Sequence, residues 1–197
     1  MGTWLQAVAN WPWGPIAATI LGSGAVSATC AHLFQSRREA AALRRDAAST
    51  AITAAQRLEG YAREVALVAD SWKSVCPYSQ GDSAKPWPNI PDIDRLDWRS
   101  VEKRLTDRAL GFREEVAKQR ALVSAYFEDD DDAGIDQAVE SALSLGLTSW
   151  NLAADLRREY GFPGGRSRVN QHYDFIKWLN TEQAERIARR EAHDQHQ

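Results

Sequence analysis

The chain has 197 residues and opens with a stretch that lacks charge, because no Asp, Glu, Lys or Arg occurs before Arg37. Inside this stretch, Gly14 to Phe34 is long enough to cross the hydrocarbon core of a bilayer, since twenty helical residues at ~1.5 Å each reach about 30 Å. The run mixes Ile, Leu and Val with Ala, Gly, Ser and Thr, so its apolar character is modest. The absence of charge predicts a single transmembrane anchor over about residues 14–34.

Cysteine is also scarce, with only Cys30 and Cys76 in the chain. If one helix joins them they lie about 70 Å apart, which excludes a disulfide between them within one chain. No metal-ligand spacing surrounds either residue, and two reduced thiols suit a cytosolic location. Basic and acidic residues are nearly balanced, 24 against 27, so the overall charge does not favour nucleic acid as a partner.

The residues on either side of the uncharged run support an anchor and give it a direction. Trp11 and Trp13 precede the run, where indole rings favour the membrane interface. The first basic residues all follow it: Arg37, Arg38, Arg44 and Arg45. Under the positive-inside rule, this asymmetry predicts an inner-membrane protein with its N-terminus outside and its C-terminal domain in the cytosol.

Two alternatives remain open for the same stretch. A cleaved signal peptide is one, although positive charge is missing before the apolar run. A buried helix of a soluble protein is the other, because Gly22 and Gly24 weaken a span. If the span is inserted, the pairs Ala18/Gly22 and Gly24/Ala28 have the spacing that lets two membrane helices approach closely, so a homo-oligomer through the span is a further expectation.

The rest of the chain is predicted to be helical. We expect residues 1–36 to form the membrane end, 37–192 a cytosolic helical-bundle domain with a proline-rich loop at 77–96, and 193–197 a disordered tail. The fold class is therefore all-α, with an N-terminal transmembrane helix running into a long amphipathic helix that packs with about three further helices. The predicted helices span about 36–76, 97–127, 135–160 and 170–191.

The strongest periodic signal lies in the first of these helices. Its apolar residues recur at alternating steps of three and four, as in a heptad: Ala51, Ala54, Leu58, Tyr61, Val65, Val68, Trp72 and Val75. The charged flanks of a coiled coil are incomplete, so a place in an intramolecular bundle is favoured over a homo-oligomer through residues 51–75. On this phase Glu59 faces outward, and its replacement is expected to cost less than about 0.5 kcal/mol.

Local signals mark the other elements. Asp97 is a candidate cap for the second helix, Gly161 a left-handed cap for the end of the third, and Asn180-Thr181 a possible restart of the fourth. Trp87, in the proline-rich loop, is predicted to fold back onto the bundle. The apolar stripe of the second helix is predicted to be Trp98, Val101, Leu105, Leu110, Phe112, Val116, Leu122, Val123, Tyr126 and Phe127.

An acidic run at 128–132 invites comparison with a calcium-binding loop. Asp129, Asp131 and Glu140 fall at positions 1, 3 and 12 of such a loop, but Ala133 stands at position 5, where an oxygen ligand is needed. Acidic residues before a helix N-terminus, where the helix dipole favours them, are the better interpretation.

Nothing in the sequence assembles a catalytic constellation. His172 is the only histidine inside the predicted bundle, and His193 and His196 lack a third ligand for a metal. We predict no catalytic, cofactor-binding or metal site. The expected function is that of a membrane-anchored helical interaction or structural protein rather than an enzyme, with a membrane-tethered enzyme using an interhelical cleft as the alternative.

Two segments carry a resemblance to other proteins. The first is LFQSRRE at 33–39 with LRRD at 43–46, and the second is LAADLRREYGFP at 152–163. Together they resemble small bacterial single-span membrane proteins of uncharacterised activity. The resemblance implies an architecture, one span followed by a helical domain, and no activity.

Overall fold

The computed structural model describes residues 24–73, 87–168 and 174–194. Within these ranges the chain is all-α, as predicted, with a single isolated bridge between Arg168 and Asp174. In chain order the elements are α3 (Gly24–Lys73), the 3-10 turn η1 (Trp98–Ser100), α4 (Lys103–Asp129), α5 (Asp131–Glu159) and α6 (Phe175–Asp194). Contacts divide the chain into an N-terminal unit, Met1–Asp46, and a C-terminal unit, Ala47–Gln197.

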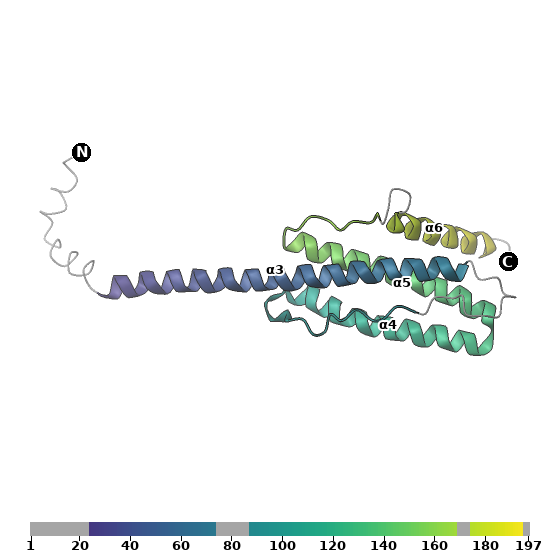
Figure 1. Cartoon of the computed structure of the whole chain (residues 1–197), viewed down its shortest axis with the longest axis horizontal. Helices are drawn as coiled ribbons and strands as arrows, with labels where there is room; N and C mark the ends of the chain where they lie inside the picture. Colours follow the sequence, from purple (N-terminus) through teal and green to yellow (C-terminus); the bar gives the residue numbers. More distant parts are fainter. Residues whose placement is uncertain (1–23, 74–86, 169–173, 195–197) are drawn as a thin grey trace, which may run out of the picture. The chain divides into compact units, whose positions relative to one another are not determined.

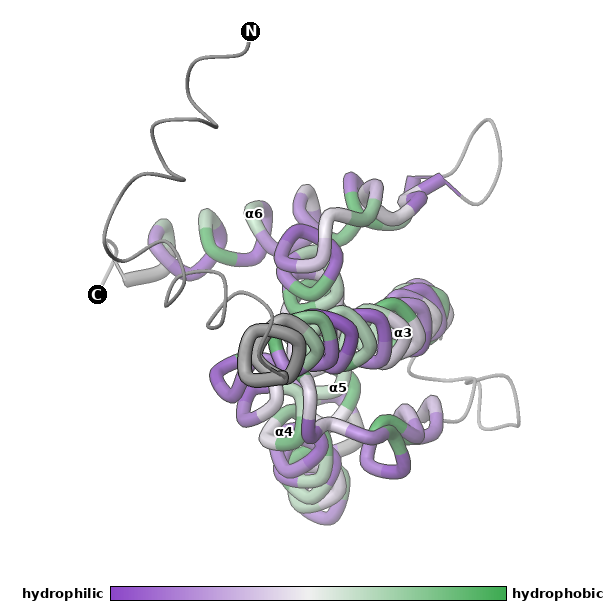
Figure 2. The backbone as a smooth tube through the Cα atoms, turned by 90° about the vertical axis from the view of Figure 1, so that its left-hand side faces the viewer, coloured by the Kyte–Doolittle hydropathy of each residue, from purple (hydrophilic) through white to green (hydrophobic). Residues whose placement is uncertain are grey.

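The C-terminal unit is a helical bundle in which α3 and α5 lie between α4 and α6 (Figures 1 and 2). Ser149 of α5 is fully buried, and its hydroxyl donates to the Leu58 carbonyl of α3 at 2.8 Å. Gly146 of α5 allows a close approach, because a Cβ at that position would lie 3.1 Å from Leu179 of α6 and 3.7 Å from Val65 of α3. These contacts hold three helices together around one core.

The heptad of α3 is confirmed by burial. Its described members from Ala51 to Val68 are buried and Trp72 packs against the core, whereas Val75 lies outside the described residues. The buried face is wider than the heptad, because Ala55 and Ala62 are buried beside it. Small side chains on this flank let α3 sit deep among its neighbours.

One position of α3, Glu59, is less exposed than the heptad predicted. Glu59 was expected to face solvent, but its side chain is only 14% exposed and binds Arg157 of α5 through two contacts. The widened face explains the error, because burial of Ala55 and Ala62 brings the intervening turn against α5 as well.

Residues 87–96, the described end of the predicted proline-rich loop, pack against the bundle. Trp87 packs against the core, as predicted, with its ring 6.1 Å from that of Trp72. Trp98 is buried and its indole N–H donates to the Ile93 carbonyl at 2.8 Å. Asp97 is a cap, as expected, but of the 3-10 turn η1 rather than of the long helix, since α4 begins only at Lys103.

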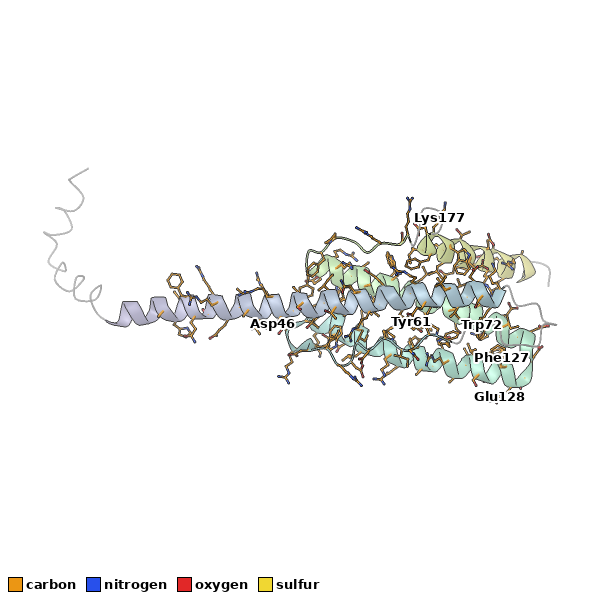
Figure 3. The ribbon with its side chains drawn as sticks, viewed as in Figure 1. Asp46, Tyr61, Trp72, Phe127, Glu128 and Lys177 are labelled. Carbon is orange, nitrogen blue, oxygen red and sulfur yellow. The ribbon has the colours of Figure 1, made fainter. Side chains whose placement is uncertain are left out.

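The apolar stripe of α4 is narrower than predicted. Leu105, Phe112 and Val116 are buried, whereas Leu110, Leu122 and Tyr126 are exposed. Phe112 and Tyr61 meet edge to face, with ring centroids 5.6 Å apart. The other end of α4 carries Phe127, whose ring lies 5.5 Å from that of Trp72; Figure 3 shows the side chains of Tyr61, Trp72 and Phe127 between α3 and α4.

Tight caps join the last helices. Asp130 separates α4 from α5 and accepts from the Asp132 amide at 2.9 Å. The acidic run is therefore helical on both sides of Asp130 rather than a calcium-binding loop, and its first two residues end α4 instead of preceding a helix. At the other end of α5, Gly161 has φ 70°, and the Phe162 amide bonds the Arg157 carbonyl, which together form the predicted left-handed cap. Helix α6 begins after Asp174 and runs through Asn180 without the predicted restart.

Candidate functional site

The sequence places the predicted membrane residues at the start of the chain, and the structure describes only part of them. Trp11 and Trp13 lie outside the described residues, as do 14–23 of the predicted span. Residues 24–34 form the first turns of α3. Across the described part of the chain, no helix has both the length and the apolar character that crossing a membrane requires.

The four arginines chosen from the sequence all lie on α3 in the N-terminal unit. Every residue from 31 to 46 is exposed. At about 100° per residue, the four arginines occupy one sector of the helix surface about 120° wide, which we call the arginine face. It consists of Arg37, Arg38, Arg44 and Arg45. Exposed Phe34, 65% accessible, lies in the middle of this sector.

The arginine face has few internal partners. Arg45 donates to the Ala41 carbonyl at 3.2 Å, whereas Arg37, Arg38 and Arg44 make no ion pair or hydrogen bond through their side chains within the described part of the chain. The acidic residues of the same segment, Glu39 and Asp46, lie about 150° from the centre of the face. The helix is therefore positively charged on one side, and these positive charges are available to an external anion.

A second charged region lies between α5 and α6. The Glu182 carboxylate is 4% exposed and contacts Lys73 of α3, with Nζ and Oε2 2.5 Å apart. Arg186 and Arg189 each lie 3.7 Å from its other oxygen. Beside this cluster a hollow of about 400 Å³ is lined by Tyr126, Ala133, Asp136, Gln137, Glu140, Arg186, Arg189 and Arg190.

The charges around this hollow are internally balanced. Arg186 reaches Asp136 at 3.4 Å, and Arg190 pairs with Glu140. An anion would have to displace carboxylates that already neutralise these guanidinium groups. The arrangement joins three helices, and we interpret it as structural. Sequence reasoning missed it because Lys73 and Glu182 stand 109 residues apart and no local pattern links them.

Buried donors gather where the proline-rich loop meets the bundle. The Tyr61 hydroxyl, the Trp87 indole N–H and the Arg120 Nε are buried without a hydrogen-bond partner. Burial raises the pKa of Tyr61 to about 12, and the neighbouring Trp87 and Arg120 side chains oppose part of that rise. A phenol with this pKa stays protonated at neutral pH, so Tyr61 is a poor general base there.

The remaining chemistry-bearing residues form no site in the described part of the chain. His172 lies outside the described residues, and nothing can be said of its surroundings. In residues 24–73, 87–168 and 174–194, no three His, Cys, Asp or Glu side chains are grouped closely enough to hold a metal ion. The arginine face is therefore the feature with the clearest capacity for an outside partner.

Comparisons of the chain with protein families, with curated proteins and with solved structures find no match.

Proposed function

We propose that this chain is a membrane-anchored, all-α interaction or structural module of the inner membrane, with its N-terminus outside and its bundle in the cytosol. The observation that carries the proposal is a change in character at Arg37. Before it stand 36 residues without an acidic or basic side chain, and after it comes an exposed helical segment with four arginines on one side. An apolar run ending at clustered arginines is the usual boundary of a span at the cytosolic surface.

The core of the C-terminal unit supports a module rather than an enzyme. Trp98 is buried, and Trp72, Trp150 and Trp178 pack against the same core. Trp72, Trp150 and Trp178 are partly buried and cover the core from its edge, as expected of side chains that pack helices together.

The heptad residues of α3 help to distinguish a bundle within one chain from a pairing of two chains. Those from Ala51 to Val68 are buried within their own chain, which favours the intramolecular arrangement over pairing of two chains through 51–75. A homo-oligomer through the predicted span stays a prediction, because most of that span lies outside the described residues.

Membrane fractionation tests the anchor. The full chain is expected to sediment with membranes and to resist extraction by high salt and by alkali. Ile20→Asp should release it, because Ile20 lies well inside the predicted span and an acidic residue costs up to about 3 kcal/mol there on insertion scales. The same charge placed before the span, in Ala7→Asp, should leave the protein with the membrane. Full-length wild-type protein in the soluble fraction would overturn the anchor.

Reporter fusions test the direction. A reporter joined after Gln197 should be active only if it works in the cytosol. Activity there of a reporter that requires export would contradict the proposed orientation while leaving the anchor intact.

A further inference from the structure

The arginine face has a geometry that a topology signal alone does not require. The positive-inside rule counts basic residues near a span and is indifferent to the side of the helix on which they lie. In this helix the four arginines share one sector about 120° wide, and Glu39 and Asp46 lie on the opposite side. The segment is thus divided lengthwise into a basic and an acidic side.

The basic side also differs from those arginines of the C-terminal unit that join its helices. There, Arg108 lies 2.7 Å from Asp155, and Arg157 and Arg190 each bind a glutamate. On the arginine face, by contrast, Arg37, Arg38 and Arg44 have no carboxylate partner within the described residues, although Glu39 is close in sequence. Guanidinium groups held together and left unpaired suit a surface with many phosphates.

We propose that the arginine face binds the phosphate groups of acidic phospholipids, so that the helix leans on the membrane surface where it leaves the bilayer. This inference rests on the proposed anchor, which places Arg37 directly beyond the span. The membrane is the favoured source of phosphate because Phe34, 65% exposed, lies in the same sector and suits the interface between headgroups and acyl chains.

Helix dimensions explain why the helix has to tilt toward the membrane surface. Arg45 follows Phe34 by eleven residues, which is about 16 Å along the axis. The headgroup layer is only about 5–8 Å thick on each side. An upright helix would therefore bring Arg37 and Arg38 to the phosphates and carry Arg44 and Arg45 past them. A tilt toward the arginine face brings all four within reach and turns Glu39 and Asp46 to the solvent.

Amide hydrogen exchange of the full chain in vesicles tests the proposal. One set of vesicles is pure phosphatidylcholine, and the other contains three parts of phosphatidylglycerol to seven of phosphatidylcholine. We expect residues 37–46 to exchange at least fivefold more slowly in the acidic vesicles, the factor that corresponds to ~1 kcal/mol for one arginine at an acidic surface. The difference should vanish at 1 M salt, where the screening length falls to about 3 Å. Amides of α5 serve as the internal reference.

A composition-matched variant separates the face from the count of arginines. Arg38→Glu with Glu39→Arg, combined with Arg45→Asp with Asp46→Arg, keeps every residue type and the positive bias after the span but divides the basic side. All four positions are exposed, so the bundle should be unaffected. This variant should stay membrane-bound and lose the lipid-dependent protection. Equal exchange in the two kinds of vesicle for the wild-type chain, or equal protection in the variant, would overturn the arginine face as a phospholipid site.

Flotation distinguishes failure of the face from failure of the anchor. A chain that floats with neutral vesicles after an alkaline wash is anchored, and the exchange experiment then decides the face alone. A chain that floats only with acidic vesicles, and is removed by salt, would overturn the anchor and support the face. A chain that floats with neither would overturn both.

Discussion

Glu59 of α3 and Arg157 of α5 form a two-point ion pair at the edge of the core. Arg157 Nε lies 2.5 Å from Glu59 Oε1 and Arg157 Nη2 lies 3.0 Å from Oε2, with 12% and 14% of the two side chains exposed. The hydrogen bonds that Arg157 donates to the Glu59 carboxylate raise the pKa of Arg157, and burial opposes that rise. Arg157 also donates to the Pro163 carbonyl at 3.1 Å, so the pair fixes the chain that leaves α5.

Removing one partner of this pair should be costly. Glu59→Ala leaves the Arg157 guanidinium mostly buried without its counter-charge, and we expect a loss of about 2–4 kcal/mol in the free energy of unfolding. Replacing both residues with methionine should cost less than either single change, because no charge is left unpaired. Urea denaturation measures each value. Glu185→Ala, at an exposed pair with Arg189, is the control and should cost under about 1 kcal/mol.

The phase of α3 is tested by two leucines nine residues apart. Leu58 is fully buried and Leu67 is 36% exposed. In the fragment 36–197, which is expected to fold alone, Leu58→Ala should cost about 2–5 kcal/mol and Leu67→Ala under about 1 kcal/mol. Equal losses would show that the phase is wrong. A loss at Leu58 that depends on protein concentration would show that the seam joins two chains.

Adjacent glycines after α5 should respond differently to alanine. A Cβ at Gly165 would lie 2.3 Å from Glu59 Oε1 and 3.0 Å from Trp150, whereas nothing lies within 4 Å of one at Gly164. Because Arg157 holds the Glu59 carboxylate, Gly165→Ala should destabilise the bundle by about 1–3 kcal/mol. Gly164→Ala should be neutral or slightly stabilising. In the Glu59→Ala background most of the Gly165 effect should disappear, and full additivity would contradict the contact.

The raised pKa of Tyr61 predicts that the folded chain loses stability at high pH. Its pKa is about 12 in the folded chain and ~10 in an unfolded one, so the unfolded state loses its proton first. Stability attributable to the neutral phenol is present below pH 10 and falls as the pH rises toward 12, by up to ~1.4 kcal/mol per pH unit. Tyr61→Phe should remove this slope and, because the hydroxyl is buried without a partner, cost little at neutral pH.

The measurement is the free energy of unfolding between pH 9 and 12, together with phenolate absorbance. Tyr126→Phe, at an exposed position, is the matched control and should leave the slope unchanged. A Tyr61→Phe variant with the wild-type slope would show that another group causes the alkaline loss.

Much of the fold was predictable because its signals are local. The three-and-four spacing of α3, the Asp97 cap and the Gly161 cap each depend on residues within a few positions of one another. The acidic run at 128–132 was expected to precede a helix as a whole, and this is right only for its second part: Asp130 caps α5 and Asp131 begins it, whereas Glu128 and Asp129 end α4. The positions of the four arginines on one exposed side of a helix also follow from spacing alone.

What could not be predicted depends on contacts between distant segments. Glu59 was assigned to the surface because its partner Arg157 belongs to another helix. Leu110 and Leu122 were assigned to the core because they are apolar, but the sequence of a helix does not show whether another element packs over a given apolar residue. The burial of Glu182 could not be predicted, because it depends on the surrounding side chains of Lys73, Arg186 and Arg189.

The buried alanines of α3 determine how freely this helix can change in sequence. They are Ala47, Ala51, Ala54, Ala55, Ala62, Ala66 and Ala69. A leucine such as Leu58 can exchange with methionine or isoleucine of similar volume, whereas any larger apolar residue in place of a buried alanine overpacks the interface. Glycine and serine would fit but weaken the helix. Over evolutionary time the large positions of this face should therefore drift while its small ones persist. A distant relative would be recognised by the spacing of its alanines rather than by overall identity.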